Sequence, residues 1–198
     1  MRFRIAALLA LLCALTLSAT AFGAAPTGNK AFCFDGPSEG TQYGGSCTAL
    51  SPNRFYLDTN GADPDGEYAG IAIQNDYPAG TALSSINRLS FQYTGTAPYG
   101  GAPRISLGVD ESGDGSGYDA FAFVAAETCN DGFGKVDVIN DATCQIDYKG
   151  AAYSNWSTFL TAFPLAEVGY DYTFIVADAP GEWTIYNAQL GAKSRGGK

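Results

Sequence analysis

Apolar and polar residues alternate along most of the chain in short runs, which is the period-two pattern of half-buried antiparallel strands. In one run Leu89, Phe91 and Tyr93 share a face, and in another Ile105 and Leu107 do so. Turns rich in glycine, proline and aspartate separate the runs. Strands are predicted at 68–74, 89–93, 104–109, 119–125, 135–139, 172–177 and 183–190. The pattern therefore indicates an all-β, antiparallel β-sandwich.

One short helix is predicted at 154–163. Its apolar residues Trp156, Phe159, Leu160 and Phe163 recur at helical spacing, Ser154 or Asn155 can cap the first turn, and Pro164 follows. Trp156 is therefore expected in the core, and so is Trp183, which alternates with Ile185 on the last predicted strand.

Residues 1–23 have the pattern of a secretory signal peptide, with a basic start, an apolar segment at 5–17 and small residues near the cleavage zone. The apolar segment is too short for a permanent anchor, and no later run approaches membrane-spanning length. We therefore expect a secreted, extracellular protein with no membrane span. The remainder is expected to be one β-sandwich domain at 24–192, followed by a disordered basic tail at 193–198.

Acidic residues dominate the charge, with 20 Asp and Glu against 11 Lys and Arg. This balance argues against nucleic acid as a partner, because phosphate backbones are bound mainly by Lys and Arg. We expect a monomer whose partner is a glycan or a component of the cell envelope.

Four cysteines remain after Cys13 is removed with the signal, which suits an oxidising compartment. Three pairings are open, and proximity in the sequence favours Cys33 with Cys47 and Cys129 with Cys144. Each local bridge would contribute roughly 3 kcal/mol in the chain-entropy model.

The segment 110–119 places oxygen-bearing side chains at alternate positions around glycines, as in loops that wrap calcium. The candidate ligands are Asp110, Ser112, Asp114, the Ser116 carbonyl and Asp119, with Glu111 as an alternative to Asp119. The flanks are predicted strands, and position twelve is Phe121 where an EF-hand has Glu, so this is not an EF-hand. A solvated hairpin turn is the equally weighted alternative.

Three stretches resemble secreted bacterial jelly-roll domains of unassigned function, which are similar to galactose-binding-like carbohydrate-binding modules. The matching residues are ALSSINRLSFQY at 82–93 with GAPRISLGVD at 101–110, NWSTFLTAFPLA at 155–166, and GEWTIYNAQLG at 181–191. The resemblance implies a jelly-roll or galactose-binding-like sandwich, a structural calcium ion, and glycan binding on a sheet face or at the loop rim. Ser112 departs from the Asp usual in the related domains.

The chain contains no histidine, which limits the possible catalytic mechanisms. It excludes catalytic triads in which histidine activates a serine or a cysteine, and it excludes zinc bound by histidine. A glycosidase would need a carboxylate pair, with Glu67, Glu127 and Glu182 as candidates. A polysaccharide lyase would pair a tyrosine base with Arg88 or Arg104. The alternative is that all of these are surface residues, and we favour a non-catalytic protein.

The chain has 12 tyrosines, whose flat rings stack on sugars and whose hydroxyls orient a ligand. Tyr99, Tyr118 and Tyr153 are the preferred candidates for ligand binding, and Tyr43 and Tyr170 are also predicted in loops. The sequence thus favours a secreted glycan-binding module supported by calcium. A structural protein of the envelope or matrix without a small ligand is the second hypothesis, and an enzyme acting on neutral polysaccharide is the third.

Overall fold

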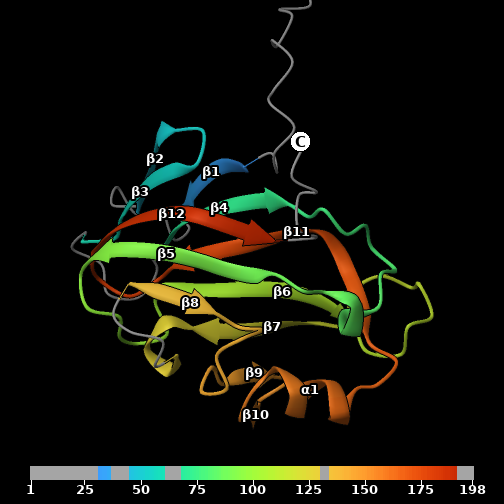
Figure 1. Ribbon diagram of the computed structural model, residues 1–198. Coiled ribbons are helices and arrows are strands. Elements are labelled where there is room, and N and C mark those ends of the chain that lie inside the picture. The colour runs from blue at the N-terminus through green and yellow to red at the C-terminus, as the bar shows by residue number, and fades with distance from the viewer. Residues whose placement is uncertain (1–30, 37–44, 61–67, 130–133, 191–198) are drawn as a thin grey trace, which may run out of the picture.

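The computed structural model describes residues 31–36, 45–60, 68–129 and 134–190, and these residues form two antiparallel sheets packed as a β-sandwich (Figure 1). The large sheet has seven strands in the order β1 (Ala31–Gly36), β4 (Tyr68–Gln74), β11 (Glu167–Ala177), β6 (Arg104–Asp110), β7 (Ala120–Ala125), β9 (Ile146–Tyr148) and β10 (Ala151–Tyr153). The small sheet has five in the order β2 (Ser46–Ser51), β3 (Arg54–Asp58), β12 (Glu182–Leu190), β5 (Leu89–Gly95) and β8 (Lys135–Asp137). The predicted all-β sandwich is confirmed.

Each predicted strand has a counterpart, β4 with the predicted bounds and the other six with bounds that differ by one to five residues. Strand β8 ends at Asp137 because the chain then turns, with the amides of Asn140 and Asp141 donating to the Asp137 carbonyl. Strand β11 begins at Glu167, and a bulge between Val168 and Thr173 interrupts its alternation. Strands β1, β2, β3, β9 and β10 are not among the predicted ones.

The predicted helix is present as α1 (Trp156–Ala162), and two short 3₁₀ turns lie at η1 (Leu83–Ser85) and η2 (Ala126–Thr128). Asn155 is the N-cap, because its side-chain oxygen accepts a hydrogen bond from the Thr158 amide at 2.9 Å. The ring centroid of Tyr148 on β9 lies 5.5 Å from that of Phe159 and 5.1 Å from that of Phe163. The helix region therefore packs beside β9 and β10, and among the described elements no helix covers the outer face of the large sheet.

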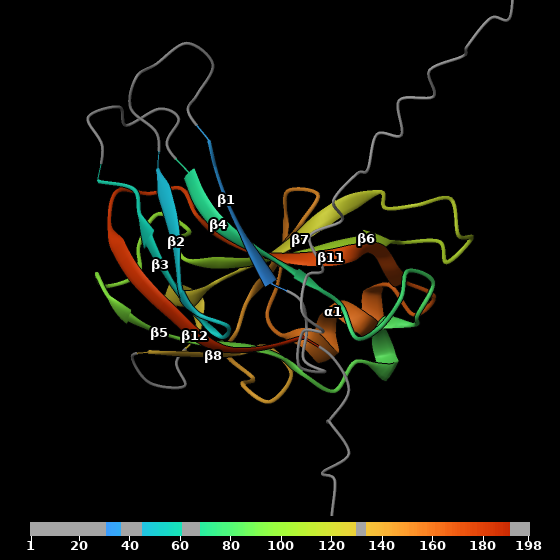
Figure 2. The same cartoon turned by 90° about the horizontal axis from the view of Figure 1, so that it is seen from above.

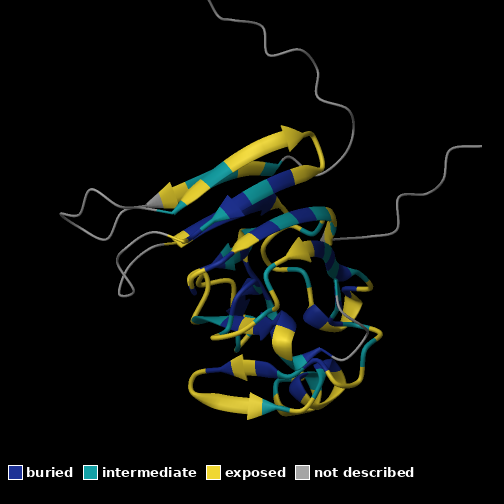
Figure 3. Cartoon of the chain, turned by 90° about the vertical axis from the view of Figure 1, so that its left-hand side faces the viewer, coloured by how far each residue is buried: buried dark blue, intermediate teal, exposed yellow. Residues whose placement is uncertain are grey.

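The core lies between the sheets, where buried residues gather (Figure 3), and most of the inward-facing residues of both sheets are apolar. Trp183 on β12 is fully buried, and its indole Nε1 donates to the Thr96 carbonyl at 2.9 Å. Trp156 is 6% exposed. Both tryptophans are therefore core residues, as the alternation predicts.

The structure contains both predicted disulfides, Cys33–Cys47 and Cys129–Cys144. The first joins β1 of the large sheet to β2 of the small sheet, two strands that run beside each other (Figure 2). It therefore holds one edge of the sandwich closed. In the part of the chain that is described, no helix has the length and apolar character to cross a membrane.

Candidate functional site

The two outer faces of the sandwich differ sharply in chemistry. On the small sheet, buried Leu89, Phe91 and Tyr93 alternate with outward Ser90 and Gln92. The neighbouring strands also turn mostly polar side chains outward, namely Arg54, Tyr56, Thr184, Tyr186, Lys135 and Asp137. This is the usual solvated face of an antiparallel sheet.

The outer face of the large sheet instead carries aromatic rings that form one connected cluster. Neighbouring ring centroids lie between 4.8 and 6.4 Å apart. The cluster consists of Phe32 and Phe34 from β1, Tyr68 from β4, Tyr118, Phe121 and Phe123 from β7 and the loop before it, and Tyr170, Tyr172 and Phe174 from β11. We call these residues the aromatic face.

Small residues form the floor beneath the rings. Gly70 and Ala72 on β4 are register partners of Phe34 and Phe32, and Ser106 and Gly108 on β6 are register partners of Phe123 and Phe121. A side-chain Cβ on Gly70 would lie 2.4 Å from the Cζ of Phe34. The glycine therefore allows the Phe34 ring to pack directly against the backbone of the sheet.

Gly108 has the same role at the other end of the face. A Cβ there would lie 2.8 Å from the Cβ of Tyr170 and 3.4 Å from the Cβ of Tyr118. Tyr170 thus approaches the backbone of β6 because residue 108 has no side chain, and Tyr118 lies beside it at contact distance.

Much of this cluster is open to solvent. Phe32 is 51% exposed, Tyr118 48% and Tyr170 40%. The hydroxyls of Tyr118, Tyr170 and Tyr172 make no hydrogen bond with another described residue. The face therefore combines apolar rings with hydroxyls that are available to a ligand.

The aromatic face extends across the strands more than along them. Phe32 lies on β1 and Phe123 on β7, and β4, β11 and β6 lie between these two strands. Four steps of the usual inter-strand spacing give a span of about 19 Å. This is longer than one sugar ring.

The cation at the rim of the aromatic face is paired with a carboxylate. The guanidinium of Arg104 lies 5.2 Å from the ring centroid of Phe123 and forms an ion pair with Asp178. Asp147 is the register partner of Phe123 on β9 and is exposed. Because the cation at the rim is already paired, the face favours a neutral ligand over an anion.

The acidic loop 110–119 connects β6 to β7, and its carboxylates accept hydrogen bonds within the loop. Asp110 is 2% exposed, and its two oxygens accept from the amides of Gly113 at 2.9 Å and Gly115 at 2.8 Å. Asp119 accepts from the Glu111 amide at 2.8 Å. The loop therefore folds around Asp110 and ends directly before β7.

Asp114 is held in its ionised form. Hydrogen bonds from the side chain and amide of Ser116, with a smaller contribution from Ser112, lower the pKa of Asp114 below its ordinary value. Among the described residues, a group of three potential ligands with atoms within 4.8 Å of one another occurs at Cys129, Asp141 and Cys144, whose cysteines form a disulfide. Calcium in the acidic loop stays a prediction, and the Oδ2 atoms of Asp110 and Asp119 each accept one backbone amide and keep a further lone pair for a ligand.

The structure separates the three tyrosines predicted to bind a ligand. Tyr118 lies in the aromatic face, whereas Tyr99 precedes the opposite end of β6 and its hydroxyl donates to the Pro180 carbonyl. Tyr153 is half-buried, with its ring against Phe159 of α1 at 5.4 Å. Tyr99, Tyr118 and Tyr153 therefore do not form one site.

Tyr170, predicted in a loop, lies on β11 and belongs to the aromatic face. Tyr43 lies outside the described residues. The phenylalanines of the face are absent from the sequence prediction. The pattern at 120–124 does indicate them, because Phe121 and Phe123 alternate with Ala122 and Val124. Both faces of this strand are therefore apolar, and the phenylalanines lie on one of them.

The carboxylates considered for catalysis do not form a pair by contact. Glu127 accepts from the Gly101 amide at 3.0 Å, while Glu182 accepts from the Tyr56 hydroxyl at 2.7 Å and from Asn60 at 3.0 Å. The hydrogen bond to Glu182, followed by burial and by the charges of Glu182 and Asp58, raises the pKa of Tyr56 to about 12. Glu67 lies outside the described residues.

Comparisons with known proteins give little sequence similarity. No family model matches the chain, and no curated protein matches it. One solved structure that matches the chain is the xyloglucanase domain of NopAA, a type three effector from Sinorhizobium fredii, determined in complex with cellobiose. It is 18% identical, the match covers 78% of this chain and 90% of that chain, and the TM-score is 0.36.

Proposed function

We propose that the protein is a secreted, non-catalytic recognition module that binds neutral glycan through the aromatic face. The observation that carries this proposal is the connected cluster of rings exposed on one outer sheet face. Soluble monomers rarely expose a contiguous apolar patch of this kind unless it binds something. Aromatic rings with available hydroxyls suit the apolar faces and polar edges of sugar rings.

The position of the rings supports an extended ligand. Phe32 on β1 and Phe123 on β7 mark the two ends of a surface that crosses several strands, with Phe174 on β11 between them. A segment of oligosaccharide can contact several rings at once, whereas a single sugar contacts one or two. We therefore expect affinity to increase with chain length until the ligand spans the face.

The paired cation at the rim of the face predicts that binding is insensitive to salt. The protein is acidic overall, and Arg104 at the rim is paired with Asp178. Stacking and hydroxyl hydrogen bonds are screened little by added salt, unlike binding to an anionic polymer. Retention on glycan should therefore be similar at low and high ionic strength.

Calcium in the acidic loop would have a structural role in this function. Tyr118 lies at the end of that loop, one residue before Asp119, whose carboxylate holds the Glu111 amide. An ion that fixes the loop would also fix the Tyr118 ring against Tyr170.

The test is a depletion assay with insoluble cellulose, chitin, xylan and mannan. Wild-type protein should be retained on at least one of them, and Tyr118→Ala and Tyr170→Ala should each weaken binding by about fivefold, as expected for loss of about 1 kcal/mol of ring contact. Tyr186→Ala is the matched control, because this half-exposed tyrosine lies on the polar outer face of the small sheet.

Equal retention of all three variants would contradict the assignment of the aromatic face. Retention of wild-type protein on none of these polysaccharides, nor on any neutral glycan of an array, would favour the second hypothesis. In that case the same face would pack against another protein in a structural layer of the envelope or matrix.

An enzyme acting on neutral polysaccharide is the third hypothesis. It requires turnover that is lost on changing one carboxylate, and Glu127→Gln and Glu182→Gln are the variants to compare. We expect neither reducing-end release by the wild type nor any effect of these changes on glycan retention.

A further inference from the structure

A polar depression of about 380 Å³ lies on the outer face of the small sheet, opposite to the aromatic face in the sandwich. Its lining side chains are Asn87, Arg88, Ser90, Asp137, Asn140 and Gln189. Gln189, Ser90 and Asp137 are neighbours in register on β12, β5 and β8, so they form a row across three strands. The volume falls within the range of small-ligand sites, and the lining is entirely polar.

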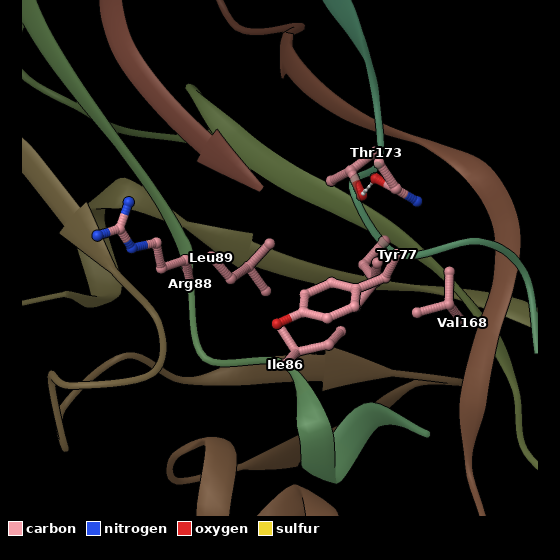
Figure 4. Close-up of a pocket in the computed structure, with 8 residues that line it drawn as sticks. Tyr77, Ile86, Arg88, Leu89, Val168 and Thr173 are labelled. Carbon is pink, nitrogen blue, oxygen red and sulfur yellow. Dashed lines mark hydrogen bonds between the residues drawn. The ribbon is translucent and has the colours of Figure 1, made fainter. Parts of the chain in front are cut away.

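Arg88 supplies a positive charge to this depression that no other described residue neutralises. Figure 4 shows its guanidinium turned away from Tyr77, Ile86 and Leu89, which line a narrow crevice of about 10 Å³ beside it. Arg88 is half-buried and has no ion pair within the described chain, whereas Arg104, Lys135 and Lys149 are all paired with carboxylates. An arginine stays charged at any relevant pH, so a guanidinium without a carboxylate partner among the described residues can bind an anion.

The carboxylate of Asp137 does not supply that anion. Its Oδ1 accepts from the amide and side chain of Asn140 at 3.3 and 2.9 Å, and its Oδ2 lies 3.2 Å from the Lys135 Nζ. Asp137 is therefore paired with Lys135 and is not a partner for Arg88, but its carboxylate remains ionised and repels a doubly charged anion in the same depression more than a singly charged one. This arrangement favours a ligand with a single negative charge.

The remaining lining groups suit hydroxyls. Ser90 and the amides of Asn87 and Gln189 each donate and accept hydrogen bonds, as sugar hydroxyls also do. The side chains of Ser90 and Gln189 make no hydrogen bond with another described residue. A ligand that presents one carboxylate beside several hydroxyls would satisfy both the guanidinium and these groups.

We propose that the depression is a second binding site, specific for a sugar acid such as a uronic acid residue, whose carboxylate is held by the two-pronged guanidinium of Arg88. The site is independent of the proposed glycan binding, because it lies on the opposite sheet and uses none of the rings of the aromatic face. Both sites can therefore be occupied at once.

Isothermal titration of the whole protein with sodium glucuronate tests this site. Arg88→Gln should weaken glucuronate binding by about tenfold or more, since it removes a charge-assisted hydrogen bond. Arg54→Gln is the matched control, because Arg54 also lies on the small sheet without an ion pair in the described chain but lies outside the depression. Methyl glucoside, which has the same ring without the carboxylate, should bind at least tenfold more weakly than glucuronate.

Three results would overturn the proposal. One is equal glucuronate binding by wild type and Arg88→Gln, with thermal unfolding verifying that the variant folds. Another is equal binding of sodium sulfate and glucuronate, which would indicate an unselective anion site. The third is a loss of glucuronate binding in Tyr118→Ala, which would place the sugar acid on the aromatic face. If Arg88→Gln does not fold, Gln189→Ala replaces it, and wild-type affinity in that variant would also overturn the proposal.

Discussion

Gly108→Ala should displace two rings of the aromatic face while leaving the fold intact. Gly108 lies on β6 in the floor of the face, and an added Cβ would come within 2.8 Å of the Cβ of Tyr170. A Cβ is fixed by its own backbone, so the strain cannot be relieved by rotating the Tyr170 ring. The backbone of β11 must move instead, and we expect the Tyr118 ring, whose centroid lies 5.8 Å from that of Tyr170, to shift with it.

The expected cost follows from two opposing effects. Overpacking costs typically 1–3 kcal/mol, here about 2 kcal/mol, while replacing glycine in the unfolded chain recovers about 0.5 kcal/mol. A net loss of about 1.5 kcal/mol lowers the thermal midpoint of a domain of this size by roughly 5 °C. Displacement of two rings should weaken glycan binding by about tenfold or more.

Thermal unfolding by circular dichroism and the depletion assay measure the two effects on the same sample. Ser106→Ala is the control, because it lies on the same strand and face and changes neither the register nor the space above the floor. Wild-type stability and wild-type glycan retention in Gly108→Ala would refute the close approach of the tyrosines to the sheet.

Three further predictions concern the bridge, the acidic loop and the small sheet. Replacing Cys33 and Cys47 together by alanine should lower the unfolding free energy by about 3 kcal/mol, measured by urea denaturation, because the bridge closes the edge that holds β1. Millimolar calcium should raise the thermal midpoint relative to chelator, by the equivalent of about 2.7 kcal/mol at a hundredfold excess over Kd, and Asp114→Ala should remove the response; an unmoved wild-type midpoint would leave the loop as a hairpin turn. Ultraviolet titration should find that Tyr56 ionises with a pKa of about 12, and that this pKa returns toward 10 in Glu182→Gln. The stabilisation from the Tyr56 hydrogen bond should be present below pH 10 and lost as the pH rises through 12.

The sequence predicts the central strands because the residues on their inner faces are buried and differ in character from the residues on their outer faces. Strand β4 has the predicted bounds, and β5 alternates buried Leu89 and Phe91 with polar residues. Strand β1 reverses this pattern, since its large residues Phe32 and Phe34 point outward and its inward residues are Ala31 and Cys33. The alternation is then too weak to reveal the strand.

Edge strands give little signal for a different reason. Strand β2 is almost wholly exposed, and β9 and β10 are three residues each. Such strands form because a neighbour presents free hydrogen-bonding groups, which is a tertiary effect. Strand β11 also begins earlier than its alternation indicates, because the bulge after Val168 shifts the pattern.

The sequence predicts the candidate site only in part. Tyr118 is predicted as a ligand residue, but the phenylalanines around it look like core residues in the sequence. Only the sheet order brings β1, β11 and β7 into one surface, because these strands are far apart in the chain. The same order separates Tyr99 from Tyr118 by the length of β6.

The most direct test of the aromatic face is an NMR titration with ring-labelled phenylalanine and tyrosine, using soluble oligosaccharides of glucose, N-acetylglucosamine, xylose and mannose. Assignments would come from single substitutions. We predict that the ring signals of Tyr118, Tyr170 and Phe123 shift on addition of a bound oligosaccharide, while those of Tyr56 and Tyr186 on the small sheet do not. Saturable binding that shifts the ring signals of Tyr56 and Tyr186 and leaves those of the aromatic face unchanged would contradict the proposal that the aromatic face binds glycan.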